Sequence, residues 1–351
     1  MFRVQLAPEY LAKLPEAQQA NIKRPIHLQH GLTGSSDNYF INSEGGKGDS
    51  NSIGMWLVDQ GYDVWAGNNR GNKYSKNSDV TDPRKYYDFS YTEFGQYDVP
   101  AMVKYILKTT ENEDGKVTWI GHSEGTTQMF IGLSDPKTKD YLNAHIERFI
   151  ALAPITYLNQ VASDNLKEAA KFEELVLVAT EVYGLYEMFT GPCVPDAKWD
   201  ELKDFACKKL GFLCPTENSG LDPSVANMGV VPYIAKLSPG GASVKQFAHY
   251  AQFIKSAYPI FNNYDYGYLG NMLNYGTSTP PAWDVSQITV PLTMLAGELD
   301  DLATKANNDV LLSNLSGKQE VTYIPGYHHS TFLYPKDIGD FSEYITKALA
   351  E

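Results

Sequence analysis

The sequence has no run of about 18 consecutive apolar residues, no long block of one charge sign and no low-complexity segment. The first absence argues against a membrane-spanning helix, and the other two argue against a disordered tail. Positive charge is also scarce, because 29 Lys and Arg stand against 42 Asp and Glu, a formal net charge of −13. Such a chain repels phosphate groups, so we expect neither nucleic acid nor an anionic membrane surface as a partner.

Cysteine is rare as well, with three in the whole chain: Cys193, Cys207 and Cys214. They lie in one short segment, where two can form a disulfide and leave one free thiol. Three unpaired, partly buried thiols are the alternative. A structural zinc site is disfavoured, because the segment has no histidine nearby.

The 351 residues are 43% hydrophobic, which suffices for one large domain or for a core with an inserted subdomain. Strand-like and helix-like patterns alternate in both ends of the chain. The strand-like segments are residues 25–31, 62–67, 117–120, 149–153, 292–297 and 321–324, and the helix-like segments are 51–60, 94–108 and a run from 126. This alternation predicts an α/β fold with a mainly parallel sheet flanked by helices.

The middle of the chain breaks this alternation. Residues 155–284 have helical patterns, loops and all three cysteines but few strand signals. We interpret them as an inserted, largely helical cap or lid subdomain, with residues 1–154 and 285–351 as the core. One cap segment is apolar on nearly all sides, at Phe172, Leu175, Val176, Leu177, Val178, Ala179, Val182, Tyr183, Leu185, Tyr186 and Met188. Such a helix is usually buried, and the alternative is a lid helix whose second face meets lipid.

Residues 121–125 read Gly-His-Ser-Glu-Gly and lie between a strand-like and a helix-like segment. A nucleophile elbow has this pattern, because a sharp turn lifts the serine hydroxyl clear of the sheet and the flanking positions must lack bulk. The turn also puts Ser123 at a helix N-terminus, where the dipole favours developing negative charge. The pattern alone is weak, and its strand–turn–helix context makes Ser123 the candidate nucleophile.

A serine nucleophile needs a base and an acid, which follow it in the order Ser, Asp, His in this type of fold. Asp300 follows the strand-like segment 292–297 and is the candidate acid, with Asp301 as the alternative. His328 and His329 follow the last strand-like segment. Both pairs lie in loops beyond strand ends, where catalytic side chains are commonly held. Surface histidines without a role are the alternative.

The tetrahedral intermediate of acyl transfer needs two backbone N–H donors, one from the residue after the nucleophile and one from the loop after an early strand. Glu124 and Leu32 occupy these positions. Leu32 lies between Gly31 and Gly34, where glycines let the backbone approach a substrate closely. This chemistry needs neither a metal nor a cofactor, and we expect none.

Further segments match a family pattern: 28–32 (LQHGL), 61–72 (GYDVWAGNNRGN), 89–90 with 97–101 (FS and YDVPA), 121–127 (GHSEGTT) and 151–154 (ALAP). With them, nearly the whole chain resembles the gastric and lysosomal acid lipase family, neutral-lipid hydrolases that cleave triacylglycerols and cholesteryl esters. The resemblance implies the α/β-hydrolase fold. Its motifs G-x-x-D-x-L-A and Y-x-H-x-x-F place the acid at Asp300 and the base at His329, with His328 as a neighbour. It also implies a disulfide between two of the cap cysteines, although the interval from Cys193 to Cys207 is longer here.

The chain departs from the family at Glu124, where the family has Gln. A carboxylate beside the oxyanion site opposes negative charge there if it is ionised, whereas the backbone donor itself can remain. We hypothesise that Glu124 shifts activity towards acidic pH.

The sequence thus predicts serine-dependent hydrolysis of triacylglycerols or sterol esters through an acyl-enzyme, at a lipid–water interface. The alternatives are an esterase or acyltransferase acting on soluble substrates and, in another class, a catalytically inactive hydrolase fold that serves as a binding module. A monomer fits the sequence, which fixes no oligomeric state. The resemblance implies a secreted or lysosomal protein; residues 1–6 lack the pattern of a secretory signal, and the chain begins where the family already has its first strands.

Overall fold

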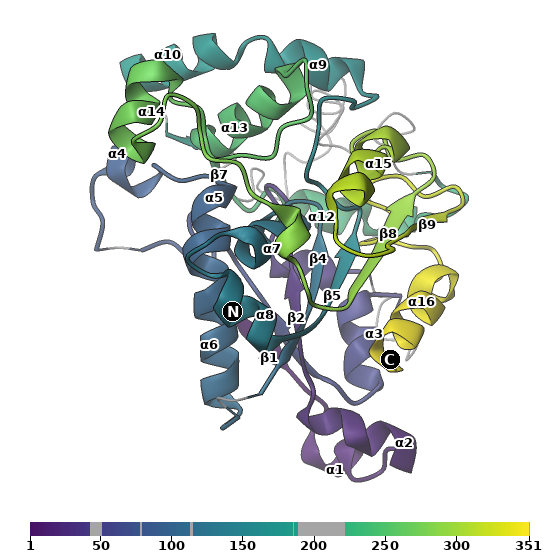
Figure 1. Ribbon diagram of the computed structural model, residues 1–351. Coiled ribbons are helices and arrows are strands. Elements are labelled where there is room, and N and C mark those ends of the chain that lie inside the picture. Colours follow the sequence, from purple (N-terminus) through teal and green to yellow (C-terminus); the bar gives the residue numbers. More distant parts are fainter. Residues whose placement is uncertain (43–50, 78, 113–114, 185, 189–221, 351) are drawn as a thin grey trace.

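The computed structural model describes residues 1–351 except 43–50, 78, 113–114, 185, 189–221 and 351. Its centre is a seven-stranded sheet in the order β1-β3-β2-β4-β5-β8-β9 (Figure 1). Within this sheet β1 pairs antiparallel with β3, and its other strand pairs are parallel. The strands are β1 (Phe2–Val4), β2 (Pro25–Gln29), β3 (Asp63–Ala66), β4 (Val117–His122), β5 (Ile146–Leu152), β8 (Leu292–Gly297) and β9 (Val321–Ile324).

Helices cover both faces of this sheet (Figure 1). On one face, α6 (Val99–Thr109) and α7 (Glu124–Ser134) pack against β4, and α8 (Lys139–His145) packs against β5. On the other face lie α3 (Ile53–Asp59) and α16 (Gly339–Ala350). The remaining core helices are α1 (Pro8–Leu11), α2 (Glu16–Gln19), α4 (Pro83–Tyr86), α5 (Tyr91–Glu93) and α15 (Lys305–Asn314). Because both faces are covered, β2, β3 and β4 are buried along their whole length.

The predicted alternation of strands and helices is confirmed, with shifts of a few residues at the ends. The first helical segment of the 94–108 pattern is a π-helical turn, Phe94–Asp98, that leads into α6. The helix after the elbow begins at Glu124, two residues before the expected start. β1 was missed because three residues are too short to show an alternating pattern. An ion pair of 2.8 Å between Arg3 and Asp63 accompanies its pairing with β3.

Between β5 and β8 the chain forms the inserted, largely helical cap that was predicted. Figure 1 shows it in teal and green above the sheet. Its described elements are α9 (Asp164–Ala170), α10 (Glu173–Tyr183), α12 (Val231–Leu237), α13 (Val244–Lys255), α14 (Gly267–Tyr275) and a small antiparallel pair, β6 (Glu187–Met188) with β7 (Ala242–Ser243). α13 packs against α9 and α10. Cys193, Cys207 and Cys214 lie outside the described residues.

The cap helix α10 is not buried on all sides. The expectation that its apolar pattern reflects complete burial is therefore wrong. Val178, Val182 and Tyr183 are 61%, 69% and 74% exposed, and Phe172 at its N-terminus is also exposed. α10 lies at the outside of the cap and packs against α13 (Figure 1). Because it has this partner on one side, its other apolar face lies in solvent.

Candidate active site

Ser123 lies at the sharp turn between β4 and α7. Its backbone adopts φ 55° and ψ −120°, a conformation that residues other than glycine rarely take. There is no room for a side chain on either flank: a Cβ atom on Gly121 would lie 2.3 Å from the carbonyl oxygen of Gly125, and one on Gly125 would lie 2.1 Å from that of Gln29. The close packing of α7 on β2 and β4 therefore requires both glycines of the pattern.

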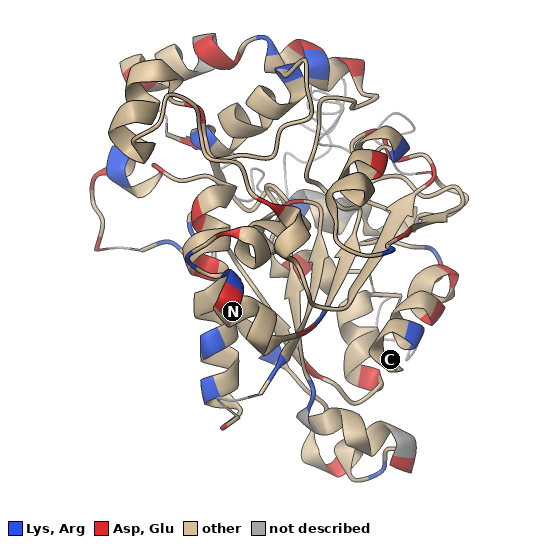
Figure 2. Cartoon of the chain, viewed as in Figure 1, with Lys and Arg blue, Asp and Glu red and all other residues tan. Residues whose placement is uncertain are grey.

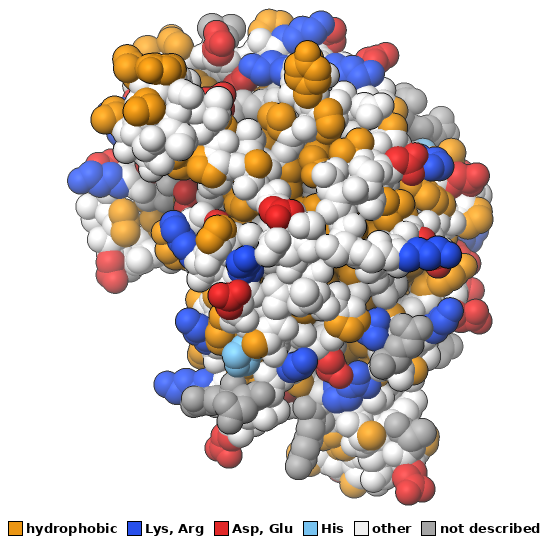
Figure 3. Space-filling view, in the orientation of Figure 1, with side chains coloured by type: hydrophobic (Ala, Val, Ile, Leu, Met, Phe, Trp, Pro, Cys, Tyr) orange, Lys and Arg blue, Asp and Glu red, His pale blue; other side chains and the backbone are white. Residues whose placement is uncertain are grey.

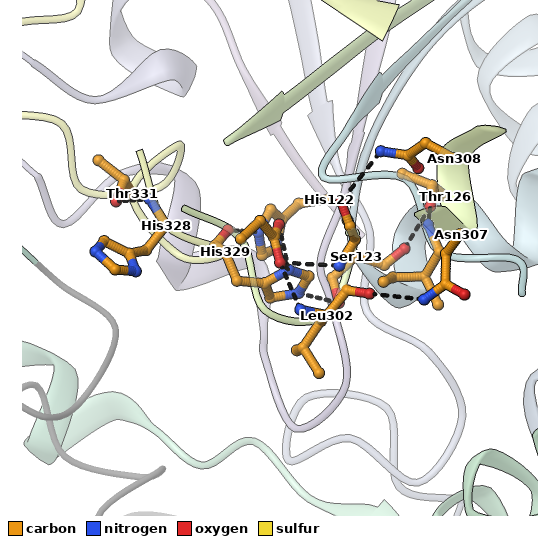
Figure 4. A network of polar contacts seen from close by, with 12 residues as sticks. His122, Ser123, Thr126, Leu302, Asn307, Asn308, His328, His329 and Thr331 are labelled. Atoms are coloured by element: carbon orange, nitrogen blue, oxygen red, sulfur yellow. Dashed lines mark hydrogen bonds and ion pairs between the residues drawn. The ribbon is translucent and has the colours of Figure 1, made fainter. Parts of the chain in front are cut away.

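The loops that follow β8 and β9 bring the carboxylate of Asp300 and the imidazole of His329 to this serine. Figure 4 shows His329 beside Ser123. Nε2 of His329 lies 2.8 Å from Oγ of Ser123, and Nδ1 of His329 lies 2.9 Å from Oδ2 of Asp300. Asp300 also accepts hydrogen bonds from the backbone N–H groups of Leu302 and Ala303, at 2.9 and 2.8 Å. Because Nδ1 faces a carboxylate, it carries the ring proton and leaves Nε2 free to accept the proton of the Ser123 hydroxyl.

The charge states of this pair follow from their surroundings. Burial favours the neutral form of Asp300, but the charge and the hydrogen bond of His329 and the two backbone N–H groups outweigh it and lower the pKa of Asp300. Burial likewise disfavours the imidazolium form of His329, but the neighbouring Asp300 outweighs it and raises the pKa of His329. The site can therefore hold the positive charge that forms when His329 takes a proton.

The two rival residues lie apart from this arrangement. The side chain of Asp301 is exposed, and its carbonyl group accepts a hydrogen bond from the N–H of Ala162. The ring of His328 points away from Ser123 (Figure 4), while its backbone N–H donates to Oγ1 of Thr331 at 3.1 Å. The structure thus brings Ser123, His329 and Asp300 together and leaves the alternatives outside.

The loop after β2 lies directly against the nucleophile. A Cβ atom on Gly31 would be 2.9 Å from Cβ of Ser123, so this close approach depends on glycine. The cap holds the same loop from the other side, because the N–H of Gly240 donates to the carbonyl of Thr33 at 2.6 Å. Core and cap together therefore fix the loop that contains Leu32.

The two expected oxyanion donors are the N–H groups of Leu32 and Glu124. Glu124 is the first residue of α7, so its N–H has no acceptor within the helix. Neither group has a hydrogen-bond acceptor among the residues that the structure describes. Both are free to bind a developing oxyanion.

His122, to which the sequence assigned no role, supports the base. Its Nε2 atom lies 2.8 Å from the carbonyl oxygen of His329. Burial and the neighbouring His329 lower the pKa of His122 to about 3, so the ring is neutral and its Nε2–H donates to that carbonyl. The only sequence signal was its place next to Ser123, since its partner lies 207 residues away.

The Glu124 side chain is fully buried where α7 meets the cap helix α13. Its two carboxyl oxygens accept from Nε2 of Gln246 at 3.0 and 3.2 Å, and the hydroxyl of Tyr250 lies against the same carboxyl. Burial raises the pKa of Glu124 to about 8, although the hydrogen bond from Gln246 acts in the opposite direction. Below that pH the group is neutral, so the carboxylate that would oppose the oxyanion is absent there.

Comparisons with known proteins identify the family. Residues 24–178 match the family described as alpha/beta hydrolase fold. Lipase member K of Mus musculus is 31% identical over 337 residues, 93% of this chain and 81% of the mouse protein. Gastric triacylglycerol lipase of Rattus norvegicus is 32% identical over 322 residues, which cover 90% of this chain and 77% of the rat protein. The chain belongs to the gastric and lysosomal acid lipase family.

As a member of this family, the chain is a carboxylic ester hydrolase with the α/β-hydrolase fold. Among solved structures, a soluble variant of monoglyceride lipase from Saccharomyces cerevisiae shares the fold, with a TM-score of 0.50 and 16% identity over 93% of this chain and 87% of its own. Within the described part of the chain, no helix combines the length and the apolar character that a membrane crossing requires.

Proposed function

We propose that this protein hydrolyses triacylglycerols or sterol esters through an acyl-enzyme on Ser123, with His329 as the base and Asp300 as the residue that orients it. The observation that carries the proposal is the 2.8 Å contact between Oγ of Ser123 and Nε2 of His329, at a turn where Ser123 has the rare positive φ of 55°. Membership in the family supports the substrate class, because its relatives include gastric triacylglycerol lipases.

The first half of the reaction forms the acyl-enzyme. His329 takes the hydroxyl proton as Oγ of Ser123 attacks the ester carbonyl, and Asp300 stabilises the imidazolium. The carbonyl oxygen becomes an oxyanion, which the N–H groups of Leu32 and Glu124 stabilise at the positive end of α7. The bond between the tetrahedral carbon and the oxygen of the alcohol then breaks, and the imidazolium protonates that oxygen as the alcohol leaves.

The second half of the reaction uses the same groups on water. His329, neutral again, takes a proton from a water molecule, whose oxygen attacks the acyl carbon. The second tetrahedral intermediate collapses by breaking its bond to Oγ, and His329 returns the proton to Ser123. The products are a fatty acid and the free enzyme, and no step needs a redox group.

We assign residues 1–154 and 285–351 to the catalytic core and residues 155–284 to the cap. The cap supports a role at a lipid–water interface, because hydrophobic side chains gather over α10 and α14 in Figure 3. On α14, Tyr268, Leu269 and Leu273 are exposed, Leu273 to 88%. The helix has no charged residue, as its uniform tan colour in Figure 2 shows. A helix face of this kind enters the boundary of a lipid layer.

The net charge of −13 favours a neutral lipid surface over an anionic one. This agrees with neutral esters as substrates. The family supports a secreted or lysosomal location, and organelle fractionation with an antibody against the native protein tests it.

The reaction is tested by initial rates on p-nitrophenyl esters of increasing chain length and on emulsified long-chain triacylglycerol, with Ser123→Ala as the blank. We expect a preference for the emulsion and a loss of about 10⁶-fold in turnover in Ser123→Ala. An organophosphate should label the wild-type serine and not the variant. Activity confined to short soluble esters would instead identify a soluble esterase, and absence of both labelling and turnover would leave a binding module.

The cap's part is tested by the double variant Tyr268→Ser, Leu273→Ser. We expect emulsion hydrolysis to fall about fivefold or more, because each buried apolar side chain stabilises interface binding, while the rate on a soluble ester stays the same. Tyr344→Ser, an exposed tyrosine on α16, is the matched control. Equal losses on both substrates would contradict an interface role for α14.

A further inference from the structure

A buried carboxyl group between the nucleophile helix and the cap is the least expected feature of the molecule. Glu124 is 1% exposed, and none of the ion pairs among the described residues includes it. An unpaired charge in such a place is very costly, and a carboxyl group normally avoids that cost by keeping its proton. The hydrogen bonds around Glu124 show whether it does so here.

The amide of Gln246 has a fixed orientation. Its Oε1 atom accepts the N–H of Ser243 at 2.7 Å, as part of the capping box that begins α13. The Nε2 atom must therefore face Glu124, where it lies 3.0 and 3.2 Å from the two carboxyl oxygens. The NH2 group of one neutral side chain is thus the donor that Gln246 offers, whereas Asp300 faces an imidazole N–H and two backbone N–H groups.

The hydroxyl groups beside Glu124 have a fixed direction too. Thr127 donates its hydroxyl hydrogen to the carbonyl oxygen of Ile155 at 2.9 Å, because a carbonyl can only accept. In the 3.2 Å contact between Thr127 and Tyr250, the tyrosine must then be the donor. Tyr250 has no second hydrogen, so it turns a lone pair towards Glu124. A carboxylate facing that lone pair is repelled, whereas a carboxylic acid donates to it.

We propose that Glu124 works as a neutral carboxylic acid that starts a chain of hydrogen bonds through Tyr250 and Thr127 to the carbonyl of Ile155. In this state it is a positioning residue, through which the cap helix α13 holds the first turn of α7 and its oxyanion-donating N–H group. Loss of the proton removes the donor that starts the chain and puts a negative charge on the residue whose N–H must stabilise an oxyanion. Hydrolysis then weakens as the pH rises.

The other titratable groups around this contact do not supply a positive partner. On α13, burial lowers the pKa of His249 to about 3, so its ring is neutral. Lys245 points outwards to Asp88 and Tyr266. On α5, burial raises the pKa of Tyr91 well above 10. Glu93 accepts the N–H of Ser90 at 2.7 Å, and His329 lies at the catalytic serine.

Infrared spectroscopy of the whole protein tests the charge state without any substrate. At pH 6.5 exposed Asp and Glu are ionised, so a C=O stretching band of a protonated carboxyl group reports a buried one. We expect such a band in the wild type and in Glu320→Gln, which alters an exposed glutamate, and its absence in Glu124→Gln. The band should disappear as the pH is raised through about 8. A spectrum that is the same in the wild type and in Glu124→Gln at pH 6.5 would overturn the proposal.

Kinetics test the link to the oxyanion site, and this arm rests on the proposed function. Between pH 7 and pH 9 we expect kcat of the wild type and of Glu320→Gln to fall about tenfold, as one proton is lost with a midpoint near 8. In Glu124→Gln the amide keeps a donor towards Tyr250 at every pH. The kcat values of this variant at pH 7 and pH 9 should therefore differ by no more than about twofold. A tenfold fall in Glu124→Gln as well would overturn the positioning role. If no variant hydrolyses any ester, the proposed function fails, while the infrared result still decides the state of Glu124.

Discussion

Two buried carboxyl groups lie on opposite sides of the nucleophile, and their surroundings give them opposite charge states. Asp300 faces an imidazole and two backbone N–H groups, and its side chain is fully shielded from solvent. Glu124 is equally buried but faces one side-chain amide and a tyrosine lone pair. Burial raises the pKa of both, and only at Asp300 do the neighbours outweigh it.

This difference shows that burial alone does not determine the charge of an active-site acid. The number and direction of the hydrogen-bond donors around the acid determine its charge. Asp300 stays ionised and can stabilise a cation on His329, whereas Glu124 stays neutral and leaves the oxyanion site without a competing charge. Pairs of titratable groups whose pKa values are pushed apart in this way are a common means of dividing roles in one active site.

The largest effect is expected from removing the charge of Asp300. In Asp300→Asn the amide can accept one hydrogen bond from Nδ1 of His329 but carries no charge, or it can donate and force the wrong tautomer. We expect kcat to fall about 10⁴-fold with little change in KM. Asp301→Asn is the matched control, and its activity should stay within about twofold because that side chain is exposed. Equal losses in the two variants would contradict the assignment of the acid.

The two carboxyl groups should also set the two limbs of the pH profile. Asp300 raises the pKa of His329, and the base works only when neutral, so kcat/KM should fall about tenfold for each pH unit below that pKa. Removing the charge in Asp300→Asn should move this acidic limb to lower pH while the alkaline limb stays. The measurement is kcat/KM on a soluble ester from pH 4 to pH 10. An acidic limb that does not move would mean that another group controls it.

What the sequence could predict is governed by short-range packing. The elbow was visible because Gly121 and Gly125 are required by contacts that any such turn makes. The strand ends were visible in the same way, whereas the order Ser, Asp, His came from the type of fold, and the family motifs then separated Asp300 from Asp301. The parallel sheet followed from the alternation of elements alone.

What the sequence could not predict depends on contacts between distant residues. Gln246 reaches Glu124 across 122 residues, and His122 reaches the carbonyl of His329 across 207. No periodic pattern encodes such a contact. The sequence therefore placed Glu124 beside the oxyanion site but did not determine its charge, because the charge depends on the direction of the donors on α13. The exposure of α10 was missed likewise, since apolar content does not say which face finds a partner.

The smallest expected effect is on stability. The contributions of Glu124 and Asp300 to the free energy of unfolding should change in opposite directions as the pH rises. The folded protein keeps the Glu124 proton up to about pH 8, whereas the unfolded chain releases it near 4.5. Between these values the folded state binds more protons, so this group's contribution to the free energy of unfolding falls as the pH rises. The pKa of Asp300 is lowered on folding, so its contribution is present above the unfolded value of 3.8 and is lost as the pH falls.

We therefore expect the Tm of Glu124→Gln to gain on the wild type by a few degrees between pH 5 and pH 8. Glu320→Gln should follow the wild type across this range, because its side chain lies in solvent in both states. Differential scanning calorimetry at matched ionic strength measures the change. Parallel Tm curves for Glu124→Gln and the wild type would mean that Glu124 is already ionised in the folded protein, and the contrast between the two acids would be lost.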